Sequence, residues 1–289
     1  MLKSSSEDLC ADSLHHIMKQ LHPMIEQAHQ GGIRVTVSVV DLSVNAGNVG
    51  FLIGSEEQYK SASTIKLAIA CALLQMVDRG EICLEDQTVV RNEDVVGGSG
   101  SLQQEVMPLR ATIGRLARLM IAQSDNTATN VLIDVVGFER VRALLEGLGI
   151  HRTQLGRKMF APVHSPELDN YADAQELTRL LKLVYQGELL SEYSRRLLLI
   201  WMSKQEVNTK FGAVLGDMLI AHKTGEAGNV THDTGYFLIP GRELAVAVMT
   251  EVMTTEIYEE AQRIGNPVVQ RIGKVIYDQL LSDRQELDD

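Results

Sequence analysis

The sequence predicts an α/β part, built from both ends of the chain, joined to an all-helical insert. Residues near both ends alternate as in strands, whereas the middle is periodic as in helices. Strands at the two ends must meet to form one sheet, so we expect an antiparallel sheet flanked by helices. The predicted boundaries are 1–60 plus 205–289 for the α/β part and 61–204 for the insert, all within one domain of 289 residues.

The residue patterns in the first third of the chain predict two helices and two strands. Apolar residues at helical spacing predict a helix from Ser5 to about Gln30. Alternating, β-branched residues over 33–53, interrupted at 45–48, predict two strands and a hairpin turn. A strongly apolar helix follows from Ala62 to about Asp78, and Gly80 fits its end.

The middle of the chain predicts a run of helices and one long loop. The helices cover about Leu109–Ala122, Asn126–Val136, Phe138–Leu148, Ala174–Tyr185 and Glu192–Met202. Between about Arg152 and Asp173 no periodicity is visible. A structureless loop of about 20 residues inside a compact domain is usually functional, so we expect a role for it.

The last third predicts the remaining strands. They cover Met218–Ala221, Thr234–Ile239 and Leu244–Met249, with Pro240-Gly241 as the turn between the last two. A final helix is predicted over about Pro267–Ser282. A ligand site is expected at the seam between the two parts of the chain.

Composition excludes some functions. Hydrophobic residues make up 45% and charged residues 22%, as in ordinary globular proteins. A net charge of −11 argues against a nucleic-acid partner, because phosphate binding needs a basic surface. No stretch approaches the length of a membrane span, and residues 1–8 have no apolar run like that of a signal peptide. We expect a cytoplasmic location, or a periplasmic or secreted one if this is a mature form.

The number and spacing of the three cysteines indicate no metal site and do not establish a disulfide bond. Cys10, Cys71 and Cys83 lack metal-type spacing, and buried free thiols are the simplest interpretation. An oxidising compartment would permit a Cys71–Cys83 bond. We expect no metal, no organic cofactor and a monomer.

The string Ser63-Thr64-Ile65-Lys66 predicts an activated nucleophile. Lys66 lies one helical turn after Ser63 on the same face, so its amine can approach the hydroxyl. A serine needs a base, and a lysine is a base only when its pKa is lowered. Alternatively, Ser63 or Thr64 caps the helix and Lys66 is solvated. The apolar run after Lys66 favours a buried lysine.

Two further strings carry polar groups that suit a substrate. In Ser124-Asp125-Asn126, a second hydroxyl could relay a proton and an amide could bind a carbonyl; the alternative is a helix cap at Asp125.

In Lys223-Thr224-Gly225, a cation and a hydroxyl at a strand edge suit a carboxylate, and Gly225 allows close approach of another backbone. The alternative is an exposed strand-end lysine, beside a packed or exposed His222.

All three strings occur once and in this order, and together they resemble the class A β-lactamase family of penicillin-recognising serine hydrolases. The resemblance covers nearly the whole chain and implies a β-lactamase/transpeptidase-like fold with one catalytic domain. It implies that Ser63 is acylated, that Lys66 is its base and that Ser124 relays a proton. Asn126 would bind the substrate amide, Lys223 and Thr224 would hold the substrate carboxylate, and Gly225 would lie beside them in the substrate-binding strand. The N–H groups of Ser63 and Glu226 would form the oxyanion hole.

The chain departs from this family at two places. Members usually carry Glu-x-x-x-Asn in the long loop, where the glutamate activates the deacylating water. Here Glu167 is the loop's one glutamate, and Asn170 follows it by three residues instead of four. Glu167 is thus a candidate base, with an exposed loop carboxylate as the alternative. Lys210 is the nearest substitute for the arginine that often supports the substrate carboxylate.

The expected function is that of a serine hydrolase that opens β-lactam rings through an acyl-enzyme on Ser63. The same acylation machinery also fits a D-alanyl-D-alanine carboxypeptidase or an esterase. A penicillin-binding or sensor protein that acylates without turnover is the remaining alternative. The partner is in each case a small molecule, a β-lactam or an acyl-D-Ala-D-Ala-like compound.

Overall fold

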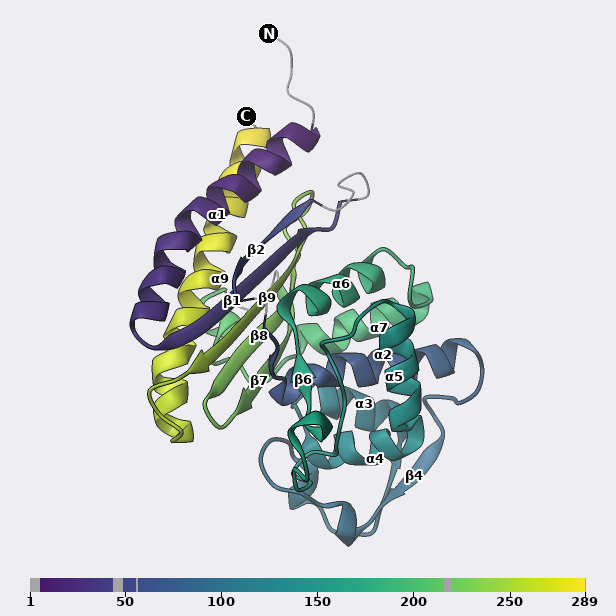
Figure 1. Cartoon of the computed structure of the whole chain (residues 1–289). Helices are drawn as coiled ribbons and strands as arrows, with labels where there is room; N and C mark the ends of the chain where they lie inside the picture. The colour runs from purple at the N-terminus through teal and green to yellow at the C-terminus, as the bar shows by residue number, and fades with distance from the viewer. Residues whose placement is uncertain (1–5, 44–48, 56, 216–219, 289) are drawn as a thin grey trace.

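A five-stranded antiparallel sheet joins the two ends of the chain in the computed structural model, which describes residues 6–43, 49–55, 57–215 and 220–288 (Figure 1). In spatial order its strands are β2 (Gly50–Gly54), β1 (Ile33–Asp41), β9 (Leu244–Val252), β8 (Val230–Phe237) and β7 (Ile220–Ala227). The first and last strands of the sequence pair along nine residues, from Ile33 opposite Val252 to Asp41 opposite Leu244. The predicted antiparallel sheet is confirmed.

Helices cover both faces of this sheet (Figure 1). On one face α1 (Ser6–Gln30) and α9 (Tyr258–Asp288) lie side by side and bury a shared apolar cluster against the strands. On the other face α6 (Ala174–Tyr185) packs on β1 and β9. The hydroxyl of Tyr236 in β8 donates to the carbonyl of Leu181 in α6 at 2.9 Å, which fixes this helix to the sheet.

The helical part is organised around α2 (Lys66–Asp78), which continues a short 3₁₀ turn, η1 (Ala62–Ile65). Its neighbours are α3 (Ile113–Ala122), α4 (Asn126–Val136), α5 (Phe138–Gly147) and α7 (Glu192–Ser203). Every residue of α2 from Lys66 to Leu74 is buried, as the apolar run predicted. The helix α8 (Phe211–Leu215) packs separately, against α9 and β7.

Two predicted helix starts are wrong. The helix expected from Leu109 begins at Ile113, because Leu109–Thr112 form strand β5 and pair with β4 (Gln87–Val90). Thr112 then caps α3 by accepting from the N–H of Arg115.

The final helix begins at Tyr258 and not near Pro267, which lies inside it. A proline removes one hydrogen bond of the helix, but burial of the apolar face of α9 against α1 and the sheet stabilises the continuous helix.

The long loop contains short ordered pieces. Strand β6 (Tyr171–Ala172) pairs with β3 (Tyr59–Lys60), and η4 (Pro166–Leu168) is a single 3₁₀ turn. With β4, β5 and β6 present, the middle of the chain is mainly, not entirely, helical. Two 3₁₀ turns, η2 (Asn92–Asp94) and η3 (Leu102–Gln104), lie between β4 and β5 in this part of the chain.

Several predicted positions lie outside the described residues: Ser5, the turn at 45–48, and Met218 and Leu219. Cys71 is buried, Cys83 is exposed, and both are free thiols. In the described ranges no helix is both long enough and apolar enough to cross a membrane.

Candidate active site

The sequence strings meet where η1 packs on the edge strand β7. A Cβ atom at Gly225 would lie 3.0 Å from Cγ2 of Thr64 and 3.2 Å from the carbonyl oxygen of Ser61. Only a glycine admits this approach without displacing its neighbours. The segment that carries Ser63 is thereby held against the strand that carries Lys223 and Thr224.

Hydrogen bonds anchor the residues just before Ser63. The ring nitrogen Nε2 of His232 lies 2.9 Å from the carbonyl oxygen of Lys60. The N–H of Ser61 donates to the carbonyl of Asn170 at 2.9 Å. Strand β8 and the long loop therefore both fix the backbone that leads into the candidate nucleophile.

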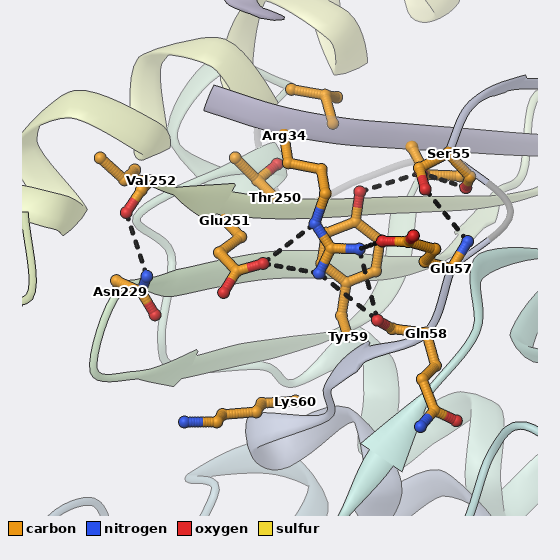
Figure 2. Close-up of polar contacts among 12 residues, drawn as sticks. Arg34, Ser55, Glu57, Gln58, Tyr59, Lys60, Asn229, Thr250, Glu251 and Val252 are labelled. Carbon is orange, nitrogen blue, oxygen red and sulfur yellow. Dashed lines mark hydrogen bonds and ion pairs between the residues drawn. The ribbon is translucent and has the colours of Figure 1, made fainter. Parts of the chain in front are cut away.

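A cation–π contact holds strand β3, which precedes Ser63 in the chain, to the five-stranded sheet. Figure 2 shows the guanidinium of Arg34 stacked on the ring of Tyr59, 3.8 Å from its centroid, and bonded to Glu251 at 3.0 and 2.5 Å. The same guanidinium also contacts the carbonyl of Gln58 at 3.4 Å. Strand β3 is thereby tied to β1 and β9.

Ser63 is half-buried, and its hydroxyl has no hydrogen-bond partner among the described residues. The preceding residue, Ala62, has a φ of +46°. Ser61 precedes η1 without a capping bond from its side chain. The alternative that Ser63 is a helix cap is therefore wrong, and its hydroxyl is available for chemistry.

Lys66 is fully buried, and its hydrogen-bond partners among the described residues are neutral oxygens. Its Nζ donates to the carbonyl of Ser124 at 2.7 Å, to the hydroxyl of Ser124 at 3.2 Å and to Oδ1 of Asn126 at 2.7 Å. Burial, and then repulsion from Lys223, lowers the pKa of Lys66 well below its usual value, while Asp125 opposes the shift. A buried amine with a lowered pKa can accept a proton.

Ser124 and Asn126 are positioned by the cap of α4. Asp125 accepts from the N–H groups of Ala128 at 2.8 Å and Leu102 at 2.9 Å, which confirms the predicted helix cap. Ser124 has a φ of +55°, a conformation that a non-glycine residue keeps only when its surroundings enforce it. The cap thus serves to aim its two neighbours at Lys66.

The amide of Asn126 is fixed in orientation. Its Oδ1 accepts from Lys66, and its Nδ2 donates to the carbonyl of Gly97 at 3.1 Å. A Cβ at Gly98 would lie 2.8 Å from this Nδ2 and 2.9 Å from the ring of Phe160. Phe160 is exposed and has a φ of +62°, so a strained aromatic residue borders the site beside Asn126.

Lys223 is fully buried, and its Nζ donates to the carbonyl of Thr224 at 2.9 Å. Burial is the main cause that lowers the pKa of Lys223 to about 7; Asp233 opposes the shift and Lys210 adds to it. Asp233 in turn accepts from the N–H of Phe211 at 3.0 Å and contacts Nδ1 of His222 at 2.8 Å. His222 is thus a buried, hydrogen-bonded residue behind the lysine.

Lys210 is fully buried and forms an ion pair with the carboxylate of Glu226. Thr209 and Tyr258 each donate to the same carboxylate at 2.8 Å. Lys210 therefore lies near β7, as the sequence suggested, but its charge already has a partner within the chain.

The carboxylates of the long loop are directed elsewhere. Glu167 is exposed and lines a hollow between η4 and α5, and its backbone carbonyl accepts from Gln154. Asp169 pairs with Arg157 at 2.7 Å, and Asp173 caps α6. None of the three is bonded to Ser63 or Lys66 in the described part of the chain.

The loop is clipped to α4 by a residue that the sequence did not single out. Asn130 accepts from the N–H of Met159 at 2.7 Å and donates to its carbonyl at 3.1 Å. The roles of Thr209, Tyr258 and His232 also escaped prediction, because their partners lie far away in the sequence. For Asn130 the sequence carries one signal, a polar residue among the apolar residues of the predicted helix 126–136.

The site resembles that of an acyl-transferring serine enzyme in its parts: a free hydroxyl, a buried amine, a second hydroxyl and an edge strand with a cation. In the described ranges no group of three or more His, Cys, Asp or Glu side chains could hold a metal ion.

Comparisons with known proteins agree with these parts. A family model described as "Beta-lactamase enzyme family" matches residues 16–280. Beta-lactamase AER-1 of Aeromonas hydrophila is 27% identical over 266 residues, covering 87% of this chain and 83% of that protein.

Solved structures are similar over the same length. The crystal structure of a beta-lactamase from Sphaerobacter thermophilus has a TM-score of 0.81 and 29% identity, and it covers 91% of this chain and 97% of its own. A variant of PBP-A, in an acyl-enzyme complex with penicillin G, has a TM-score of 0.78 and 26% identity, covering 93% and 97%.

Proposed function

Because this chain belongs to the beta-lactamase enzyme family and is a serine β-lactamase-like hydrolase, we propose that it opens β-lactam rings through an acyl-enzyme on Ser63. The observation that carries this proposal is the environment of Lys66. Burial, with no carboxylate among its hydrogen-bond partners, lowers the pKa of Lys66. As an uncharged amine it can donate to the carbonyl of Ser124 and to Oδ1 of Asn126 and take the proton of Ser63.

The proposed acylation proceeds in two steps. The oxygen of Ser63 bonds to the lactam carbonyl carbon as its proton passes to Nζ of Lys66, and the N–H groups of Ser63 and Glu226 stabilise the resulting oxyanion. The carbon–nitrogen bond then breaks, and the ring nitrogen receives a proton from Ser124. Lys66 resupplies Ser124, whose hydroxyl lies 3.2 Å from its Nζ.

A second candidate is a penicillin-binding protein that forms the acyl-enzyme and releases it slowly. The loop carboxylates favour it, because Asp169 and Asp173 are paired and Glu167 is exposed beside α5. If none of these three carboxylates reaches the acyl group, none of them can activate the hydrolytic water, and release would be slow. A related fold, a variant of PBP-A, has been solved as an acyl-enzyme complex with penicillin G.

The experiment combines turnover with intact mass. The protein is incubated with a chromogenic cephalosporin and with penicillin G, and both colour and mass are followed over time. Steady turnover supports the hydrolase, and a lasting adduct without turnover supports the penicillin-binding alternative. Neither adduct nor turnover contradicts both, and turnover of only a D-Ala-D-Ala peptide or an ester would support the peptidase or esterase.

A further inference from the structure

The side chain of Glu226 lies on the face of β7 that is expected to bind the substrate. Residues two apart on a strand project to the same side, so Glu226 shares its face with Thr224. Thr224 is one of the two residues proposed to hold a substrate carboxylate. The chain thus carries a carboxylate of its own beside the place where an anionic substrate would put one.

This carboxylate is held in place from three sides. Lys210 forms the ion pair, Thr209 donates at 2.8 Å from the segment before α8, and Tyr258 donates at 2.8 Å from the first residue of α9. Burial alone would raise the pKa of Glu226, but attraction to Lys210 and these hydrogen bonds outweigh burial and lower the pKa. Glu226 is therefore ionised at neutral pH.

The ion pair removes Lys210 from substrate binding. The amine of Lys210 is fully buried, and its bonds go to Glu226 and Thr209. Lys223 is not part of this ion pair, and its pKa of about 7 leaves it only partly charged at neutral pH. An anionic substrate group would also be repelled by Glu226.

We propose that Glu226 is a specificity-determining residue, whose carboxylate occupies Lys210 and makes the site favour acyl donors that are neutral where common β-lactams carry a carboxylate. This inference rests on the proposed acylation of Ser63. It concerns the charge of the preferred substrate and leaves the acylation chemistry unchanged.

The test compares penicillin G with its methyl ester, which differ by one negative charge at this position. The acylation rate constant is measured for both compounds, by intact mass where the adduct persists and from kcat/KM where it is released, so the test works in either case. In Glu226→Gln we expect the ratio of the rate constants, acid over ester, to rise about tenfold, the worth of one charge-assisted hydrogen bond. The amide retains the shape and the backbone N–H of Glu226.

Two variants serve as controls. Glu206→Gln removes the same charge from an exposed glutamate outside the site and should leave the ratio unchanged. Lys210→Met in the Glu226→Gln background should return the ratio close to its original value, because the freed cation is gone. Thermal unfolding checks that each variant is folded.

The outcomes separate this inference from the proposed function. If Glu226→Gln slows or speeds both compounds equally, Glu226 is only a structural link between β7 and α9, and the inference is overturned. If neither rate constant changes, Glu226 does not oppose the anion, and the inference again fails. If the unmodified protein shows neither adduct nor turnover with either compound, the proposed acylation of Ser63 fails first.

Discussion

Lys66 Nζ lies 2.7 Å from Oδ1 of Asn126, a neutral oxygen, and its other two bonds also go to uncharged acceptors. A fully buried lysine normally has a carboxylate partner, because an unpaired buried charge is costly. Asp125 is near enough to influence Lys66 but uses its oxygens to cap α4 and to bind Leu102. The arrangement favours a neutral amine, which is the state that a base requires.

Replacement of Lys66 should therefore remove the base without unfolding the protein. Lys66→Met fills the buried space with an apolar chain and should slow acylation by penicillin G by about 100-fold or more, the usual contribution of a general base. Lys60→Met, at an exposed lysine on β3, is the matched control and should acylate normally. A rate for Lys66→Met within threefold of the original would exclude Lys66 as the base.

Lys223 should produce a pH dependence that depends on the charge of the substrate. Its pKa is about 7, so it is protonated below pH 7 and loses its charge as the pH rises through that value. The acylation rate with penicillin G should fall over this range, whereas that with the methyl ester should not. In Lys223→Arg, which stays charged, the fall should disappear. The same fall for both compounds would assign it to another group.

Glu167 should not control the release of the acyl group. Its carboxylate is exposed beside α5, and its described neighbours do not include Ser63. We expect Glu167→Gln to change the rate of adduct loss, followed by intact mass, by less than about twofold, since an exposed surface carboxylate contributes little. A slowing of tenfold or more would show that this glutamate reaches the acyl group.

His232 should make the fold sensitive to acid. The carbonyl of Lys60 only accepts, so Nε2 of His232 carries the proton, and Nδ1 accepts from the N–H of Thr250 at 3.0 Å. Burial is the main cause that lowers the pKa of His232 to about 4. Its stabilisation is complete above pH 6.5 and is lost as the pH falls towards 4, because the unfolded state then binds the proton.

Between neutral pH and pH 4, His232 should lower the free energy of unfolding by about 3 kcal/mol. It is measured by urea unfolding between pH 7.5 and 4, with His232→Gln as the control. The amide can donate to Lys60 and accept from Thr250 but does not titrate in this range, so its pH dependence should be flatter by that amount. Parallel curves for the two proteins would contradict the assignment.

The fold was largely predictable because its elements carry strong local patterns. The alternation in 33–41 and 244–249 and the apolar run of α2 gave the sheet and the central helix. The starts of α3 and α9 were not predictable, because Leu109–Thr112 become a strand only by pairing with Gln87–Val90. Pro267 likewise signals a helix start, although packing extends α9 beyond it.

The site was predictable to the extent that its residues lie in compact strings. Ser63 and Lys66 are one helical turn apart, and Asp125 caps the helix that Asn126 begins. The ion pair between Lys210 and Glu226 was not predicted. The sequence suggested that Lys210 supports the substrate carboxylate and that Glu226 contributes its backbone N–H to the oxyanion hole. Only the folded chain brings their charges together, with Tyr258 from α9.

The central claim is that Ser63 is the residue that a β-lactam acylates. The most direct measurement is the intact mass of the protein after brief incubation with penicillin G, followed by peptide mapping, alongside Ser63→Ala and the neighbouring Ser61→Ala. We predict an increase equal to the mass of one penicillin G, located on Ser63, in the original protein, and no adduct in Ser63→Ala. Ser61→Ala should still acylate. An adduct of undiminished yield in Ser63→Ala, or one located on another residue, would contradict the claim.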